Sequence, residues 1–232
     1  MSPTAIPGNL LLKNGMVITG SQQYPAVIGE PFGGGYFAGY ISHTADGNPT
    51  HALIVAPRAT GATGDGYVLT NALAIKNVLS STPGTSSVFN GKANTDAMLA
   101  DTANIYPAVS FCAGLSIGGN TDWYLPSWYE LEIAYFNLKP TTSANVTTVG
   151  DNPYSVPKRL YSYTANYPLQ TALALFASPS GAERFSSGIH WTSTESTITN
   201  FQNKYISLDN GNSPQLNKTG QMNVRAFRRI AL

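Results

Sequence analysis

The chain has 232 residues, a net charge of +1 at neutral pH and a charged fraction of only 11%. This balance excludes a protein that binds nucleic acid or anionic membranes mainly through charge. The apolar fraction of 42% indicates a buried core rather than disorder. With 22 glycines, 15 prolines and 13 tyrosines, the composition is typical of a turn-rich protein that contains β-structure.

The chain contains one cysteine, Cys112, so no disulfide can form within it. Residues 1–20 lack the basic start, apolar run and small-residue cleavage site of a signal peptide. No apolar stretch approaches the roughly 20 residues of a membrane span. We therefore expect a protein that folds in a reducing cytosol and does not insert into membranes.

Residues 1–28 begin with prolines and glycines and then carry two short apolar runs, at 10–12 and 16–18. This pattern predicts an extended N-terminal arm with one or two short strands, suited to attachment or oligomerisation. The folded domain is expected to span residues 29–232.

That domain is expected to open with an antiparallel hairpin at 36–57, because two apolar runs flank a polar loop containing Asp46 and Gly47. The glycines at 33–35 lack the Lys-Ser/Thr end of a P-loop and the spacing of a Rossmann fingerprint. We interpret them as close backbone packing beside a strand, not as a phosphate site.

A first helix is predicted to start at Asn94 or Thr95, either of which can cap it, and to run to about Cys112. Pro107 lies inside this run, so a kink or a break into two helices is expected. The predicted apolar face is formed by Ile105, Ala108, Val109 and Cys112. Cys112 is interpreted as a small core residue.

A second helix is predicted where Ser127 and Glu130 have the spacing of a capping box, which gives Glu130 a structural role. Its apolar face is formed by Leu131, Ala134, Tyr135 and Leu138.

The stretch 139–189 is rich in Thr, Ser, Asn, Pro and Tyr and is predicted to be a long loop, a feature that is often functional. One short helix is expected inside it, at 168–176, where apolar residues recur at helical spacing. The chain should end in strands at 190–194, 203–208 and 222–230, with a turn at 209–211. The cations near this end are interpreted as an internal salt-bridge set or a solvated strand face; they are Lys218, Arg225, Arg228 and Arg229.

The order of hairpin, two helices, long loop and closing strands looks like that of the C-type lectin fold, and several segments sharpen the match. These are 90–95, 118–131, 191–195, 210–211, Lys218 and 224–228. The set resembles the C-terminal domain of Lcl-type collagen-like bacterial adhesins, whose pattern is roughly G-x-x-D-W-R-L-P-x-x-x-E-L, then W-S-S-T/S, then V-R-x-V-R. Many phage tail-fibre and other virion proteins carry similar domains.

The resemblance covers about residues 70–232 and implies an α+β, C-type lectin-like fold with antiparallel strands, two or three short helices and a long loop insertion. Tyr124 stands where the family usually has arginine, which removes one expected salt bridge. The Glu-Pro-Asn and Trp-Asn-Asp tripeptides of animal C-type lectins do not follow the long loop. We therefore expect no calcium-dependent sugar site, no other metal and no cofactor.

Two arrangements of side chains could suggest catalysis. Glu130 and Glu132 would face different directions on a helix, whereas glycoside hydrolysis needs two carboxyl groups across one bond. His190, Ser193 and Glu195 lie close in sequence, but nothing around them resembles a nucleophile elbow.

His43 and His51 are isolated in sequence and give no metal-ligand spacing. The formylglycine-generating enzymes share the general fold, but their chemistry depends on paired cysteines. We therefore expect no enzymatic activity.

The three tryptophans could form an aromatic platform for a sugar. Trp123 and Trp191 lie in segments that carry the resemblance, so core packing is the preferred interpretation for both. Trp128 lies on the first turn of the second helix, and the sequence does not place it.

The resemblance implies that ligands engage the face built from the long loop and the adjacent strands. Tyrosine with serine and asparagine is favoured in binding loops because tyrosine gives a large contact area at low entropy cost. The candidate ligand-binding residues are Tyr154, Tyr161, Tyr163, Tyr167, Asn200, Gln202 and Asn203. An ordinary polar loop surface is the alternative for each.

These observations predict a non-enzymatic bacteriophage virion protein, a tail-fibre, tail-tip or head-decoration subunit, that binds a glycan or protein on the host surface. Its arm would contact other virion proteins or form a homo-oligomer, for which trimers are common in fibre proteins. It would assemble in the host cytoplasm and be released by lysis. A bacterial surface adhesin or carbohydrate-binding module is the alternative, and it would need an export signal.

Overall fold

A computed structural model describes residues 4–6, 10–13, 16–19, 22–64 and 71–232. The helices are α1 (Arg58–Gly61), α2 (Gly91–Ala100), α3 (Pro107–Ala113) and α4 (Trp128–Leu138). The strands are β1 (Thr4–Ile6), β2 (Leu10–Lys13), β3 (Met16–Thr19), β4 (Gln22–Pro25), β5 (Pro31–Phe32), β6 (Gly35–Ile41), β7 (His51–Val55), β8 (Ala62–Thr63), β9 (Ser155–Val156), β10 (Ile189–Glu195), β11 (Gln202–Ser207), β12 (Gln215–Asn217), β13 (Val224–Arg225) and β14 (Phe227–Ala231). Within the described residues, no helix has the length and apolar character needed to cross a membrane.

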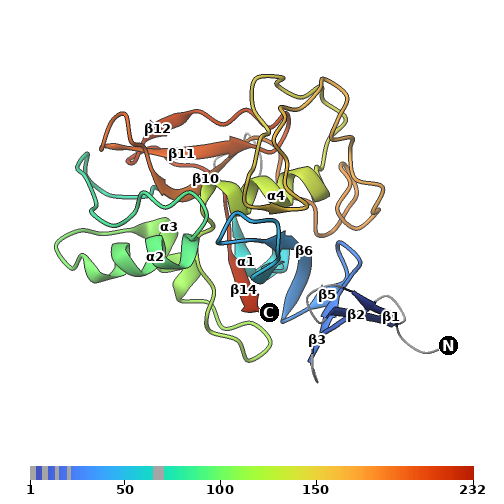
Figure 1. Cartoon of the computed structure of the whole chain (residues 1–232). Helices are drawn as coiled ribbons and strands as arrows, with labels where there is room; N and C mark the ends of the chain where they lie inside the picture. Colours follow the sequence, from blue (N-terminus) through green and yellow to red (C-terminus); the bar gives the residue numbers. More distant parts are fainter. Residues whose placement is uncertain (1–3, 7–9, 14–15, 20–21, 65–70) are drawn as a thin grey trace.

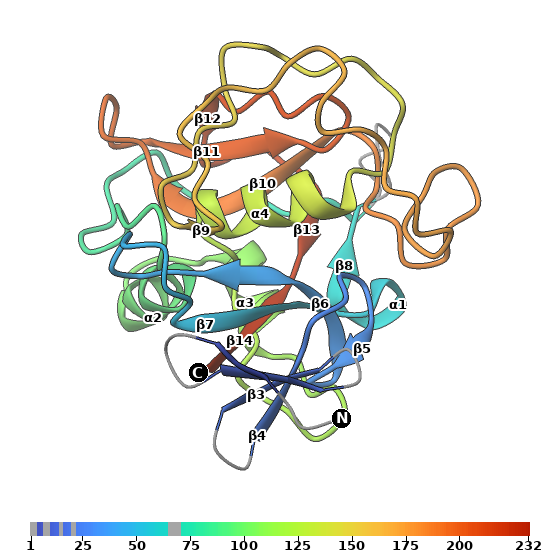
Figure 2. The ribbon, with the colours of Figure 1, turned by 45° about the vertical axis from the view of Figure 1, so that its right-hand side comes forward.

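Helix α4 lies at the centre of the molecule between two antiparallel sheets (Figure 1). On one side it packs against β6 of the sheet with order β14-β7-β6-β5, to which β9 adds a short pairing with β6. On the other side it packs against β10 and β11 of the sheet β10-β11-β12, as Figure 2 shows. Strands β1–β4 form a separate sheet. The protein is therefore a mixed α and β structure with mostly antiparallel sheets.

The predicted hairpin is confirmed, because β6 and β7 pair antiparallel with Tyr36 opposite Val55 and Ile41 opposite His51. The glycines before it also pack closely, as expected. A Cβ atom on Gly35 would lie 2.2 Å from the Val55 carbonyl oxygen, so only glycine allows this approach. On its other edge β7 pairs with β14, which ties the C-terminal segment to the first strands of the domain.

The predicted first helix is two helices, and it starts earlier than expected. Asn90, not Asn94 or Thr95, caps α2, and its side chain accepts a hydrogen bond from the Ala93 N–H at 3.0 Å. Asn94 is buried and bonds to the preceding loop instead. The expected break is confirmed, with Pro107 at the start of α3.

The apolar face predicted for this region is confirmed only in α3. Ala108, Val109 and Cys112 are buried, and burial raises the pKa of the Cys112 thiol far above its usual range. Ile105 lies before α3 and is 63% exposed, so its assignment to that face was wrong. The helix starts only at the proline, which leaves Ile105 outside the 3.6-residue period.

The capping box predicted at Ser127 and Glu130 is present at the start of α4. The Ser127 N–H and hydroxyl both donate to Glu130 Oε2, at 2.7 and 2.9 Å. The same oxygen accepts the Gly91 N–H at 3.0 Å, and Oε1 accepts the Tyr124 hydroxyl at 2.9 Å. One carboxylate therefore joins the start of α2, the turn before α4 and α4 itself. Burial raises the pKa of Glu130.

The apolar face predicted for α4 is confirmed. Its members, Leu131, Ala134, Tyr135 and Leu138, are all buried in the main core. Trp123 and Trp191 are 1% and 0% exposed and belong to a second core cluster that includes residues of α2 and α3. Their predicted core role is confirmed, and neither indole is available to a sugar.

Residues 139–188 form the expected long loop, interrupted by β9. The helix predicted at 168–176 is absent, because its backbone and side chains bond elsewhere. The Thr171 N–H donates to the Lys139 carbonyl at 2.9 Å, and the Gln170 amide donates to the Pro140 and Ser178 carbonyls. These long-range bonds replace the helical pattern.

Two expectations about strands are corrected. Strand β12 was not expected, and the described part of segment 1–28 holds the four strands β1–β4 rather than one or two. Strands of three or four residues are too short to identify by alternation alone. This segment also contacts the domain, because Tyr24 packs with Phe37 and Ala52 and donates its hydroxyl to the Ala231 carbonyl at 2.7 Å.

Three of the four basic residues near the C-terminus form ion pairs within the protein, which is one of the two interpretations given for them. The pairs are Lys218–Glu195, Arg225–Glu183 and Arg228–Asp122. Arg229 donates to the Asn90 side chain at 2.8 Å. The cations therefore hold the fold together and do not form a basic surface.

Replacing Glu130 with alanine should lower the free energy of unfolding by about 3 kcal/mol or more, because four donors lose one buried acceptor. Urea denaturation measures this. Glu130→Gln keeps a carbonyl acceptor and should cost less. Glu30→Ala is the matched control, since the Glu30 carboxylate accepts an exposed bond from the Val27 N–H, and it should change stability little. Equal losses in Glu130→Ala and the control would contradict the role of this carboxylate.

Candidate functional site

The structure places the candidate ligand-binding residues in separate surroundings. Two of these residues, Tyr163 and Asn203, are not accessible to a ligand. Tyr163 is 4% exposed and donates its hydroxyl to Glu132. Asn203 is fully buried and donates its amide to the Thr192 carbonyl at 3.1 Å. Their expected role as surface contacts was wrong, because alternation along β11 and the packing of the loop turn both side chains inward.

The other candidates are accessible but do not form one cluster. Tyr161 and Tyr167 are 56% and 49% exposed on the long loop. Asn200 is exposed, and its carbonyl accepts a hydrogen bond from the Lys218 ammonium. Gln202 is half-buried, and its side-chain amide donates to the Asn217 side chain across the β11–β12 pair. Tyr154 belongs to a different feature.

Tyr154 lies in a row of half-buried aromatic side chains that we call the aromatic row. Its members are His51, His43, Phe89, Tyr154, Tyr129 and Trp128. Successive ring centroids lie 4.3, 5.2, 4.4, 5.6 and 4.7 Å apart, and the Phe89–Tyr154 and Trp128–Tyr129 pairs are stacked. All six side chains are partly exposed. The row therefore has one side on the protein and one side in solvent.

The row joins five segments of the chain, and backbone hydrogen bonds fix them to one another. The Tyr129 N–H donates to the Val88 carbonyl at 2.8 Å, beside Phe89. The Ser42 N–H donates to the Tyr154 carbonyl at 2.8 Å, next to His43. Phe89, Trp128 and Tyr154 also pack on the main core. The row is thus a rigid part of the fold.

Three polar atoms of the row, on its tryptophan and its two tyrosines, are not used inside the protein. In the described part of the chain, the Trp128 Nε1–H and the hydroxyls of Tyr129 and Tyr154 make no hydrogen bond. In contrast, the buried indoles of Trp123 and Trp191 donate to backbone carbonyls at 3.0 and 2.9 Å. Half-buried tryptophan and tyrosine with free polar atoms are typical of surfaces that meet a partner.

A cation lies at each end of the row. The Lys204 ammonium lies 3.8 Å from the centroid of the Trp128 ring, and burial lowers its pKa. At the other end Arg229 contacts His43 Nε2 at 3.3 Å. His43 and His51, which are isolated in sequence, are neighbours here, with ring centroids 4.3 Å apart. Burial lowers the pKa of both imidazoles to about 4, with Arg229 adding to the effect.

The side chains weighed for catalysis have separate structural partners. Glu130 caps α4, whereas Glu132 points elsewhere and forms a buried ion pair with Arg159. His190 is buried against Phe185, with its ring 5.9 Å from the phenyl centroid. Within the described residues, no group of three or more metal-binding side chains occurs.

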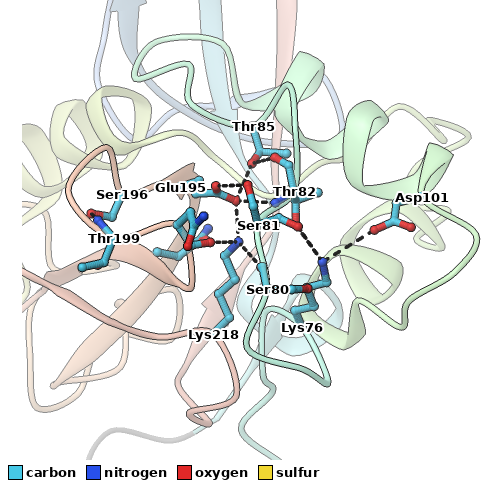
Figure 3. Close-up of polar contacts among 12 residues, drawn as sticks. Lys76, Ser80, Ser81, Thr82, Thr85, Asp101, Glu195, Ser196, Thr199 and Lys218 are labelled. Carbon is cyan, nitrogen blue, oxygen red and sulfur yellow. Dashed lines mark hydrogen bonds and ion pairs between the residues drawn. The ribbon is translucent and has the colours of Figure 1, made fainter.

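Glu195 belongs to a buried polar cluster that ties β10 to the loop before α2 (Figure 3). Its carboxylate forms an ion pair with Lys218 and accepts the Ser81 hydroxyl at 2.8 Å and the Thr82 N–H at 2.7 Å. The Lys218 ammonium also donates to the Asn200 carbonyl at 2.9 Å. Because these groups satisfy one another, the cluster is a structural tie and offers no group to a ligand.

A pocket of about 280 Å³ opens in the long loop beside Lys139 and Asn166. The Lys139 ammonium is buried and donates to the Ser143 carbonyl at 2.5 Å, the Asn145 side chain at 2.7 Å and the Pro168 carbonyl at 3.3 Å. Burial lowers its pKa. All three of its donors are engaged, so Lys139 anchors the loop to the end of α4.

Comparison of the chain with protein-family models, with curated proteins and with solved structures finds no match.

The stability of the protein should fall as the pH is lowered from about 6.5 toward 4. All three histidines have lowered pKa values, about 4 for His43 and His51 and about 3 for His190. The unfolded chain then binds protons from about pH 6.5 downward, whereas the folded chain resists them, so acid favours unfolding. Urea denaturation at pH 7, 5.5 and 4.5 measures the loss. In the His43→Gln variant, stability should fall less steeply with pH. An unchanged pH dependence in this variant would contradict the contribution assigned to His43.

Replacing Lys218 with methionine should lower the free energy of unfolding by about 3–5 kcal/mol, because Glu195 keeps a buried charge without its partner. Thermal and urea unfolding measure this. Lys92→Met is the matched control, since its pair with Asp96 is exposed, and it should have little effect. If both variants are equally stable, the buried cluster does not hold the loop before α2.

Proposed function

We propose that this chain is a non-enzymatic virion protein of a bacteriophage, a tail-fibre, tail-tip or head-decoration subunit with a C-type lectin-like domain that binds a host-surface receptor. The fold part of this proposal is supported by the order of hairpin, α2, α4, long loop and closing strands. It is also supported by the roles of the motif residues, since Trp123, Trp191 and Glu130 are all buried structural residues. Tyr124 replaces the arginine of the family and still bonds the glutamate of the motif.

The observation that carries the recognition role is the aromatic row. Six partly exposed rings from five segments are held rigidly, and three of their polar atoms stay free to bond a partner. A rigid surface loses little conformational entropy when it binds, so contacts of this kind contribute effectively to affinity.

The segment at 1–28 is proposed to attach the subunit to other virion proteins or to a second and third copy of the chain. Its short strands β1–β4 form a sheet of their own, joined to the domain at Tyr24. A small sheet with strands of three or four residues has edges that another chain can extend.

Purified particles of the phage that encodes this chain should carry it at a fixed position, visible by immunogold electron microscopy. The purified chain should also compete with those particles for adsorption to host cells, and Trp128→Ala should weaken the competition by tenfold or more. Tyr205→Phe, on β11 outside the aromatic row, is the control and should compete normally.

Absence of the chain from the particles would refute the virion role. Detection of the chain on intact, uninfected cells would favour the alternative of a bacterial surface adhesin.

A further inference from the structure

The aromatic row has the chemistry that a sugar chain requires. A pyranose ring presents C–H groups on its faces and hydroxyl groups around its rim. Such a ligand needs apolar ring surface with a few hydrogen-bonding groups beside it. Phe89 and the imidazole rings supply ring surface, while the Trp128 Nε1–H and the hydroxyls of Tyr129 and Tyr154 supply the polar groups.

The charges near the row favour an uncharged ligand. The Lys204 ammonium is placed over the Trp128 ring, and Arg229 is bonded to the Asn90 side chain. In the middle of the row, burial and then the carboxylate of Asp151 raise the pKa of Tyr129 to about 12, so its hydroxyl stays protonated. Cations at the two ends and an acidic group near the centre leave no uniform field that would select an anion or a cation.

The row is also organised before the ligand arrives. Trp128 N–H donates to the Thr194 hydroxyl at 3.0 Å, and Tyr154 N–H donates to the Asn152 side chain at 3.0 Å. The Asn152 amide in turn donates to the Tyr129 carbonyl at 3.1 Å. Three of the six rings are therefore held on a bonded backbone, so little side-chain entropy is lost on binding.

We propose that the aromatic row is the binding site for an uncharged oligosaccharide of the host surface. This inference rests on the receptor-binding function proposed above and names the class of ligand. The ligand lies over the solvent-accessible part of the row, with its hydroxyls bonded to the free polar atoms of Trp128, Tyr129 and Tyr154.

Tryptophan fluorescence tests the site directly, because Trp128 is the one partly exposed tryptophan while Trp123 and Trp191 are buried. The probes are oligosaccharides released from the host envelope by mild acid and separated by anion exchange into neutral and acidic fractions. The neutral fraction should change the emission of the full-length protein in a saturable way, and Trp128→Phe should abolish the signal. A response to the acidic fraction alone, or to neither fraction, would overturn the inference.

The double variant Tyr129→Phe/Tyr154→Phe keeps the stacked rings and removes two hydroxyls, so it should fold normally. Its Kd for the neutral fraction should rise about tenfold. The control Tyr205→Phe should bind as the unmodified protein does. Binding is measured by calorimetry, and folding by the melting temperature. An unchanged Kd in the folded double variant would overturn the proposed contacts.

Binding to intact host cells separates this inference from the function on which it rests. Periodate cleaves the vicinal diols of surface sugars, so treated cells should lose binding while protease-treated cells keep it. Binding that survives periodate and is lost with protease overturns the glycan ligand but leaves receptor binding in place. If the neutral fraction binds and no cells do, the site stands and the receptor-binding function fails.

Discussion

The arrangement of this protein depends on the buried carboxylate of Glu130. It accepts bonds from the Gly91 N–H, from the Ser127 N–H and hydroxyl, and from the Tyr124 hydroxyl. Gly91 has no alternative at this point, because a Cβ atom there would lie 2.4 Å from the carboxylate. A charge that is moved out of water is tolerated only when hydrogen bonds replace its hydration. The hydrogen bonds that the buried Glu130 carboxylate requires therefore fix the relative positions of the three segments that donate them.

The position of the aromatic row follows from this constraint. Gly91 lies two residues after Phe89, and Glu130 is the residue after Tyr129. The hydrogen bond between Gly91 and Glu130 therefore holds the Phe89 segment near the Tyr129 segment. The backbone bond from the Tyr129 N–H to the Val88 carbonyl holds the same two segments together. Tyr154 then stacks on Phe89 and completes the row. The surface that we propose for recognition is in this way built directly on the capping structure of the central helix.

The low charge content of the chain has a structural counterpart. Several of its charged side chains are engaged in buried pairs, of which Lys218–Glu195 and Arg159–Glu132 are examples. Buried pairs of this kind give the fold little net stability but make its alternatives costly, because a misplaced segment leaves a charge without a partner. The aromatic row contains no Lys, Arg, Asp or Glu side chain, and it is the part of the surface that a neutral ligand would meet.

The sequence by itself determined the features that depend on neighbours along the chain. The capping box of Ser127 and Glu130, the hairpin at 36–57 and the break at Pro107 are local, and the apolar face of α4 follows from its period. Tertiary structure decided the rest. Asn90 rather than Asn94 caps α2 because Asn94 is drawn into the core, and the helical pattern near Leu169 yields to bonds with residues at the end of α4. Of the aromatic row, Trp128 and Tyr154 stand out in the sequence, but His43, His51 and Phe89 become their neighbours only when five distant segments meet, and no periodicity along the chain encodes that meeting.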